Sequence, residues 1–405
     1  MDRQHTTSII HSALDDIRVV EIGQYVSGPY CSRLLADYGA NVMKIEPPLL
    51  GDPARRIGPF PDDIPNGEKS GIFLLLNMNK KGLTVDITTD RGSKLVKELV
   101  KTADVLIENF SPGYLSHYGL GYDQLEKINP ALVMTSITPY GSTGPYRDYK
   151  ASEINVFAMS GRMSPHGLAD REPVRYAPDA SWFQAGCTAV VPTLGAVYLS
   201  KLSGVGQHID VSAMETHIGN VDNRLLHYEY TGDEVERGYW LGGFPVGAYP
   251  CKDGYVVFGI VYERFFERLC HAMGRPDILD DPRFALASRD ENIEELEIIL
   301  LEWTMQHTQL ELFDICQKAR VLCGPLYQPS DLLNDPQLNS RSYFVKSEHP
   351  EAGILTYPGA TFIMSKTPYE FRYPAPTLGQ HNVEVYSDLG YTNKEIDYLV
   401  SAGVV

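Results

Sequence analysis

The fold of this protein is decided near the start of the chain, where residues 18–46 read RVVEIGQYVSGPYCSRLLADYGANVMKIE. Within this stretch, residues 19–22 predict a short strand, residues 29–37 predict a helix and residues 41–46 predict a second strand. Pro29 suits the first turn of a helix, and Gly39 suits the position after its end. A strand, a helix and a strand in such close succession make a βαβ unit, so we expect two neighbouring parallel strands.

The same alternation continues through the first half of the chain. Further strands are predicted at residues 83–87, 105–108, 133–137 and 207–211. A helix with one apolar stripe follows a Thr89–Asp90 cap, and residues 188–202 predict a long buried helix. The fold class is therefore α/β, with a doubly wound parallel sheet.

The composition and the predicted elements change after this first region. Residues 219–237 are polar and predict a linker, whereas residues 238–330 combine a strand with amphipathic helices. We expect a large domain at residues 1–218, a smaller α+β domain at residues 238–330, a second linker at residues 331–352 and a C-terminal segment at residues 353–405.

Charge and cysteine content limit the kinds of partner. The chain carries 35 Lys and Arg against 52 Asp and Glu, so its net charge is 35 − 52 = −17. This charge repels phosphate backbones and anionic bilayers, and we expect neither nucleic acid nor membrane as a partner. No stretch reads as the roughly 18 uncharged apolar residues of a membrane helix. The six cysteines are scattered without a Cys-x-x-Cys pair, so we expect reduced thiols, a cytoplasmic protein and no metal site.

Three short motifs could bind a ligand. Residues 23–29 (GQYVSGP) lead from a strand into a helix, where an anion can sit, although a plain tight turn is an equal interpretation. Residues 77–81 (NMNKK) predict an edge loop with two cations for a phosphate, or simply a solvated loop. Residues 107–113 (IENFSPG) offer an amide and an aromatic ring to a purine, or form an ordinary turn.

Together these motifs resemble a known family. The matching residues lie in one order along nearly the whole chain: 19–21, 34–48, 51–53, 79–81, 108–113, 119–122, 129–130, 144–146, 204–207, 324–325 and 378–381. In this order they are similar to the class III CoA-transferases, a family that includes formyl-CoA transferase and carnitine CoA-transferase-like proteins.

The resemblance implies a large Rossmann-like domain that binds coenzyme A (CoA), a small domain, and a C-terminal segment that returns to the large domain. It also implies two chains that thread through each other as interlocked rings. By position, Lys80, Asn109 and Phe110 match residues that contact CoA in the family. Pro47 and His117 stand where some members carry arginines, so this chain lacks two side chains that help to hold CoA there.

The family's nucleophile is an aspartate that begins a helix, with a glycine four residues later and a Gly-x-Gly-Gln turn after the helix. Residues 172–175, Gly186 and residues 204–207 fit this frame without a gap, and the frame places Trp182 at the position of the aspartate. Asp179 lies three residues earlier, which is a rise of about 4.5 Å along a helix. Either the nucleophile is missing, or the start of the helix is displaced so that Asp179 serves.

Other positions match further active-site features of the family. Glu153 corresponds to a glutamate near the active site of formyl-CoA transferase, or it is a surface helix cap. Ser152 stands where related racemases carry a histidine, and because serine cannot exchange an α-proton, racemisation is disfavoured. Gly242 and Gly243 match a glycine loop that closes over the active site in some members, or form an ordinary loop.

These observations lead to one main expectation and two alternatives. The main expectation is a subunit of a class III CoA-transferase, for which we suggest succinyl-CoA as donor and an acid of the aryl-succinate type as acceptor. With Trp182 at the nucleophile position, it would be the non-catalytic partner of a paralogous subunit, as in succinyl-CoA:(R)-benzylsuccinate CoA-transferase. The alternatives are a self-sufficient homodimer that uses Asp179 and a CoA-binding interaction protein without catalysis. CoA thioesters are expected as substrates, with no permanently bound cofactor.

Overall fold

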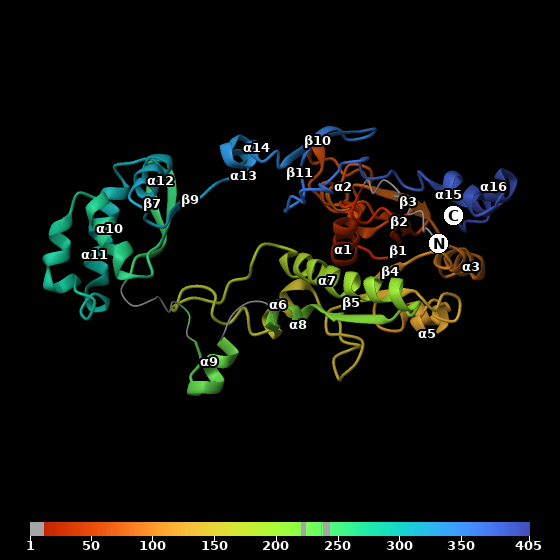
Figure 1. The fold of residues 1–405 in the computed structure, drawn as a ribbon, viewed down its shortest axis with the longest axis horizontal. Coiled ribbons are helices and arrows are strands. Elements are labelled where there is room, and N and C mark those ends of the chain that lie inside the picture. Colours follow the sequence, from red (N-terminus) through yellow and green to blue (C-terminus); the bar gives the residue numbers. More distant parts are fainter. Residues whose placement is uncertain (1–11, 220–223, 236, 238–243) are drawn as a thin grey trace, which may run out of the picture. The chain divides into compact units, whose positions relative to one another are not determined.

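The computed structural model describes residues 12–219, 224–235, 237 and 244–405. The chain divides into two compact units (Figure 1). The first comprises Met1–Gly167, Arg171–Glu234 and Ser342–Val405, and the second comprises Leu168–Asp170 and Val235–Arg341.

A six-stranded parallel sheet forms the centre of the first unit. Its strand order is β3-β2-β1-β4-β5-β6. The strands span Arg18–Glu21 (β1), Asn41–Glu46 (β2), Lys80–Thr84 (β3), Val105–Glu108 (β4), Val133–Thr138 (β5) and His208–Ser212 (β6). From β1 the chain builds outward to β2 and β3, then returns to the other side of β1 with β4, β5 and β6. The sheet therefore has a switch point between β1 and β4, where open α/β sheets place their ligands.

The predicted α/β class and most of the predicted strands are confirmed, but the third strand was expected at the wrong residues. It covers Lys80–Thr84 rather than residues 83–87, and it pairs with β2 from Val42↔Lys80 onward. The edge loop predicted for residues 77–81 is therefore also wrong, since Asn77, Asn79 and Lys80 are fully buried. Polar residues suggested a loop from sequence, whereas the fold buries them against other polar groups.

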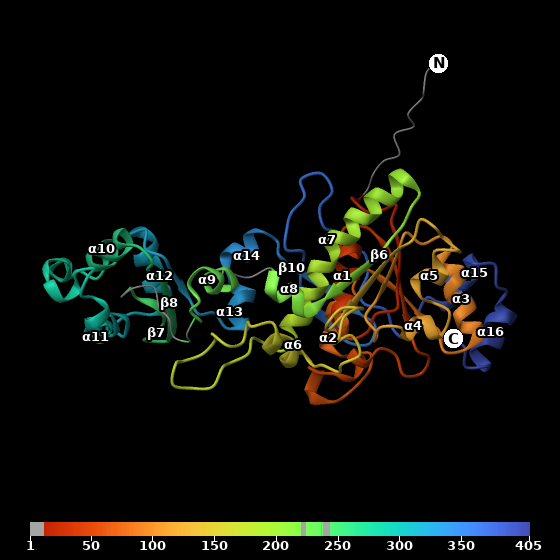
Figure 2. The ribbon, with the colours of Figure 1, turned by 90° about the horizontal axis from the view of Figure 1, so that it is seen from below.

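Helices cover both faces of this sheet. On one face, α1 (Ser27–Ala36) and α7 (Ala180–Ser203) contribute to a core with β1, β4 and β5. On the other face, α3 (Asp90–Val100), α15 (Asn382–Asp388) and α16 (Asn393–Ser401) share a second core. Figures 1 and 2 show α3, α15 and α16 side by side. The C-terminal segment thus packs in the first unit, although it follows the second unit in sequence.

Helix α7 is longer than predicted and begins eight residues earlier, at Ala180. Among the described residues, it is the helix whose length and composition would allow it to cross a membrane, which differs from our expectation from sequence. In this structure, its residues Ala185, Ala189 and Ala196 lie in the core beside the sheet. A Cβ at Gly186 would lie 2.5 Å from the carbonyl oxygen of Ser27, so this glycine lets α7 approach the start of α1 closely.

The second unit is an α+β structure with its own core. Its antiparallel sheet has the order β7-β8-β9, with strands Val246–Cys251, Gly254–Gly259 and Cys323–Pro325. Its main helices are α10 (Glu263–Ala272), α11 (Ile293–Thr304) and α12 (Gln309–Lys318). In the part of the chain that the structure describes, the remaining α-helices and strands are α2 (Gly71–Leu76), α4 (Tyr114–His117), α5 (Tyr122–Leu125), α6 (Glu153–Met159), α8 (Ala213–Gly219), α9 (Arg224–Thr231), α13 (Pro329–Asn334), α14 (Pro336–Ser340), β10 (Phe344–His349) and β11 (Gly353–Pro358).

Candidate active site

A pocket of about 620 Å³ lies in the first unit, near the carboxyl ends of β1, β4 and β5. Its lining includes Gln24, Asn109, Glu153, Asp179 and Trp182, which come from the loops after β1 and β4 and from the starts of α6 and α7. The pocket thus lies at the switch point of the sheet and brings together most of the site residues predicted from sequence.

The loop after β1 forms part of the lining of this pocket and is held by the half-buried side chain of Asn109. The side-chain amide of Asn109 binds both backbone groups of Gln24. Its Oδ1 accepts from Gln24 N (2.8 Å), and its Nδ2 donates to Gln24 O (2.7 Å). The same Nδ2 also donates to Oγ of Ser27 (3.0 Å). Asn109 therefore lines the pocket, but most of its hydrogen-bonding capacity supports the loop.

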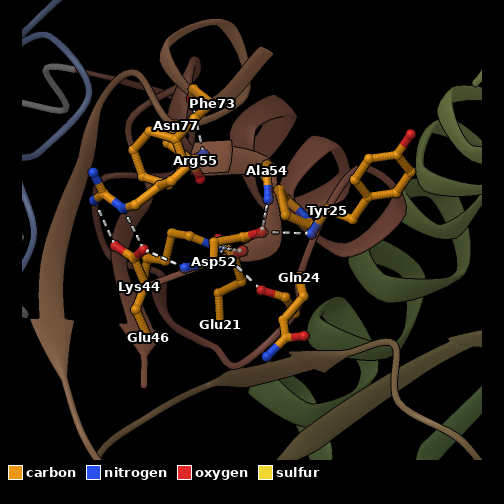
Figure 3. A network of polar contacts seen from close by, with 12 residues as sticks. Glu21, Gln24, Tyr25, Lys44, Glu46, Asp52, Ala54, Arg55, Phe73 and Asn77 are labelled. Carbon is orange, nitrogen blue, oxygen red and sulfur yellow. Dashed lines mark hydrogen bonds and ion pairs between the residues drawn. The ribbon is translucent and has the colours of Figure 1, made fainter. Parts of the chain in front are cut away.

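A buried ionic network lies beneath the loop (Figure 3). The Nζ atom of Lys44 donates to Glu21 Oε1 (2.9 Å), Asp52 Oδ2 (2.8 Å) and the carbonyl oxygen of Gly23 (3.1 Å). Burial would raise the pKa of Glu21, but the ammonium groups of Lys44 and Lys80 lower it to about 2. The network therefore holds a fixed negative charge at Glu21 and ties β1 and β2 to the loop.

Lys80 belongs to this network, and this corrects its predicted role as a CoA contact. Its Nζ donates to Glu21 Oε2 (2.8 Å), to the carbonyl oxygen of Pro29 (2.7 Å) and to Asn77 Oδ1 (2.9 Å), and the residue is completely buried. Burial lowers the pKa of Lys80 to about 8, although Glu21 opposes this shift. All three N–H donors of the ammonium are used inside the protein, so none is available for a phosphate.

Phe110 follows Asn109 and also lines the pocket. The ring stacks on that of Tyr114, with centroids 4.7 Å apart and an interplanar angle of 27°. Its backbone N–H donates to Oε2 of Glu108 (2.7 Å). Burial raises the pKa of Glu108 to about 7, against hydrogen bonds from Ser136 and from the Phe110 N–H.

Asp179 is the N-cap of α7, so the helix begins immediately after this residue rather than at Trp182. Its backbone is left-handed, with φ +65°, and its Oδ1 accepts a 2.6 Å hydrogen bond from the hydroxyl of Tyr25. Among the described residues, no group donates to Oδ2. Trp182 lies one turn further along and lines the same pocket, while its ring packs partly against the core. Both candidates for the nucleophile position therefore line the pocket: the carboxylate of Asp179 and the indole of Trp182.

Glu153 begins α6 and is almost completely buried, so a surface helix cap is the wrong interpretation. Its Oε1 accepts a hydrogen bond from Ser181 Oγ (2.6 Å), which joins the starts of α6 and α7. Its Oε2 is buried without a hydrogen-bond partner among the described residues. An unpaired buried carboxylate oxygen beside a pocket is costly unless a ligand or water reaches it.

Sequence reasoning missed several residues of the pocket. Arg147, Lys150 and Arg175 also line it and provide positive charge in a chain whose net charge is −17. From the sequence, Tyr25 is only one residue of a predicted turn, and no local signal links it to Asp179, which lies 154 residues away in sequence. Conversely, the predicted glycine loop at Gly242 and Gly243 lies outside the described residues. No cluster of three potential metal ligands occurs within the parts of the chain that the structure describes.

The parallel sheet with a carboxylate-bearing pocket at its switch point places the chain among the open α/β proteins that bind a ligand at this edge of the sheet. Residues 14–382 match the family model described as CoA-transferase family III. The chain therefore belongs to CoA-transferase family III, as the motifs predicted, and it is an enzyme that moves CoA between acyl-CoA thioesters and organic acids.

The chain is similar to curated CoA-transferases and to a solved structure. The chain is 35% identical over 400 residues to a succinyl-CoA–D-citramalate CoA-transferase of Chloroflexus aurantiacus, covering 97% of this chain and 98% of the relative. It is 30% identical over 390 residues to subunit BbsE of succinyl-CoA:(R)-benzylsuccinate CoA-transferase of Thauera aromatica, covering 93% and 95%. A crystal structure of a CaiB/BaiF family protein from Brucella suis covers 94% of this chain and 100% of its own, with 29% identity and a TM-score of 0.85.

Proposed function

We propose that this protein transfers CoA from succinyl-CoA to a small dicarboxylic acid, with Asp179 as the nucleophile. The observation that carries this proposal is the place of Asp179 at the start of α7, with its carboxylate in the pocket. From the sequence, Asp179 could serve as the nucleophile only if the start of this helix was displaced. The hydrogen bond from Tyr25 holds Oδ1 and leaves Oδ2 to attack.

The chemistry follows from a carboxylate in this position. Oδ2 of Asp179 attacks the thioester carbonyl of the donor, which gives a mixed anhydride and releases the CoA thiolate. The thiolate attacks the carboxyl carbon of Asp179, which gives an aspartyl-CoA thioester and releases the donor acid as a carboxylate. An acceptor carboxylate then attacks the aspartyl thioester, and the two steps run in reverse to give the acceptor's CoA thioester and free Asp179.

The choice of substrates is supported by the relatives and by the lining of the pocket. One relative is named for succinyl-CoA and D-citramalate, and another for succinate and glutarate. D-Citramalate, succinate and glutarate are small dicarboxylic acids. Arg147, Lys150 and Arg175 give the pocket positive charge that can attract an acid with a second carboxylate. We infer that CoA itself lies against the loop of residues 109–110, where the half-buried ring of Phe110 offers an apolar surface.

A second candidate is favoured by Trp182. In the residue frame of the family, Trp182 stands four residues before Gly186, at the position expected for the aspartate, and it lines the pocket. The similarity to BbsE, which is named as a subunit, also suits a chain that works with a paralogous partner. In this candidate, the chain forms an interlocked heteromer in the cytoplasm and leaves catalysis to the partner. In the first candidate, it forms a homodimer.

One experiment separates the two candidates. The protein is purified alone and incubated with succinyl-CoA, and the aspartyl thioester is trapped with borohydride and located by peptide mass spectrometry. We expect trapping on Asp179 and turnover with dicarboxylic acids, and Asp179→Asn should abolish both. Trp182→Asp, combined with Asp179→Asn, tests whether the family position can replace the displaced one. Absence of turnover and trapping in the unaltered protein would instead support the partner-dependent candidate.

A further inference from the structure

The hydroxyl of Tyr25 is aimed at the group that would react. It lies 2.6 Å from Oδ1 of Asp179 and donates a hydrogen bond to it. Burial raises the pKa of Tyr25 above its usual value, and the neighbouring Asp179 raises it further. The hydroxyl therefore keeps its proton throughout the pH range in which an enzyme works, and it remains a donor.

The backbone of Tyr25 is held in an unusual conformation. Its φ is +64°, in the left-handed region that residues with a large side chain seldom adopt. The carboxylate of Asp52 stabilises this turn, because its Oδ1 accepts from Tyr25 N (2.9 Å) and from Ala54 N (2.8 Å). A residue kept in a strained conformation beside a reactive group indicates a functional constraint.

Asp52 is itself fixed by the buried network. It is 1% exposed, and its Oδ2 accepts a 2.8 Å hydrogen bond from the ammonium of Lys44 (Figure 3). Lys44 also holds the carbonyl oxygen of Gly23, two residues before Tyr25. Hydrogen bonds therefore connect Lys44 of the sheet to Asp52, and Asp52 to the backbone of Tyr25. The hydroxyl of Tyr25 in turn donates to Asp179.

We propose that Tyr25 is a catalytic residue, which stabilises negative charge on Oδ1 of Asp179, and that Asp52 is its positioning residue. The inference rests on the proposed function. When the CoA thiolate attacks the carboxyl carbon of Asp179 in the mixed anhydride, the new C–S bond pushes the carbonyl electron pair onto Oδ1. As the carbonyl re-forms, the bond from this carbon to Oδ2 breaks, and the donor acid leaves with Oδ2 as its carboxylate. A donor that is already in place on Oδ1 lowers the energy of this oxyanion without reorganisation.

The substitution Tyr25→Phe removes the hydroxyl and keeps the ring. Because loss of one oxyanion donor typically costs about 100-fold in kcat, we expect a fall of that size with KM for succinyl-CoA changed less than about threefold. In rapid-quench samples treated with borohydride, the aspartyl thioester should form more slowly than in the unaltered protein. Asp52→Asn keeps the size of the side chain, and we expect a smaller fall in kcat of the same kind.

Tyr38→Phe is the matched control. The hydroxyl of Tyr38 also donates a hydrogen bond, to the carbonyl oxygen of Phe362 (2.8 Å), and this residue does not line the pocket. It should leave kcat within about twofold. Thermal unfolding of all three variants shows whether a loss of activity comes from a loss of fold.

The outcomes separate this inference from the proposed function. If Asp179 is trapped in the unaltered protein but Tyr25→Phe retains full kcat and normal formation of the thioester, the role of Tyr25 is wrong and the nucleophile stands. If Asp179 is not trapped in the unaltered protein, the proposed function fails and the role of Tyr25 fails with it.

Discussion

The ammonium of Lys80 lies 2.8 Å from Oε2 of Glu21, and neither side chain is exposed to solvent. The neighbouring Lys81 instead pairs with Glu384 at 2.6 Å, and both of these side chains are partly exposed. Two adjacent lysines on one strand therefore make ion pairs in very different surroundings, and only the buried pair contributes to the network under the pocket.

We expect Lys80→Met to destabilise the fold strongly. The change leaves the buried carboxylate of Glu21 with one cation fewer, which typically costs about 3–5 kcal/mol in free energy of unfolding. Lys81→Met is the control and should cost less than about 1 kcal/mol, because its pair is exposed to water. Urea unfolding of both variants measures the difference. Equal stability of the two would contradict the burial of Lys80.

Helix packing gives a second prediction, with both variants on α7. In Gly186→Ala, the new methyl group would meet the carbonyl oxygen of Ser27 at 2.5 Å, so the helix must shift away from α1. We expect a loss of about 1–3 kcal/mol in the free energy of unfolding. Nothing lies within 4 Å of a Cβ at Gly195, so Gly195→Ala should stabilise the helix by up to about 1 kcal/mol. The opposite order of melting temperatures would show that α7 does not approach α1 so closely.

A third prediction concerns pH and Glu108. Burial raises the pKa of this carboxyl from an ordinary value of 4.5 to about 7 in the folded state. The folded state therefore binds the proton more tightly than the unfolded chain does. The stability that this proton provides is fully present below pH 4.5 and is lost as the pH rises to about 7.

The substitution Glu108→Gln removes the ionisation and should remove this pH dependence. Relative to the unaltered protein, the variant should gain about 2–3 kcal/mol in free energy of unfolding when the pH is raised from about 5 to about 8. Asp123→Asn, at an exposed position of the same unit, should show the same difference at both pH values. A constant difference for Glu108→Gln would mean that Glu108 ionises normally in the folded protein.

Local sequence patterns predicted most of the large unit. Short segments rich in Val, Ile, Leu and Met at residues 19–22, 41–46 and 105–108 predicted buried parallel strands, and the Thr89 side chain does cap α3. The predicted bounds of the third strand were wrong because its first residues are polar. Asn77, Asn79 and Lys80 suggested a loop, and nothing local shows that Glu21, 59 residues before Lys80, would neutralise the buried ammonium.

Only some residues of the candidate site could be predicted, for the same reason. Asn109, Phe110, Glu153, Asp179 and Trp182 were named from motifs, and the fold gathers them around one pocket. Tyr25 and the cations of the pocket were missed, because their importance depends on contacts between distant segments rather than on local spacing.

The sequence by itself determined the α/β architecture and the family, since periodic burial and ordered motifs are properties of neighbouring residues. Only the tertiary structure decided that Asp179 is the N-cap of α7, that Tyr25 reaches its carboxylate and that Lys80 is unavailable to a ligand. These three facts depend on where a polar atom finds its partner after the chain has folded. Hydrogen bonds and buried charges are satisfied across space, and so spacing along the chain does not reveal them.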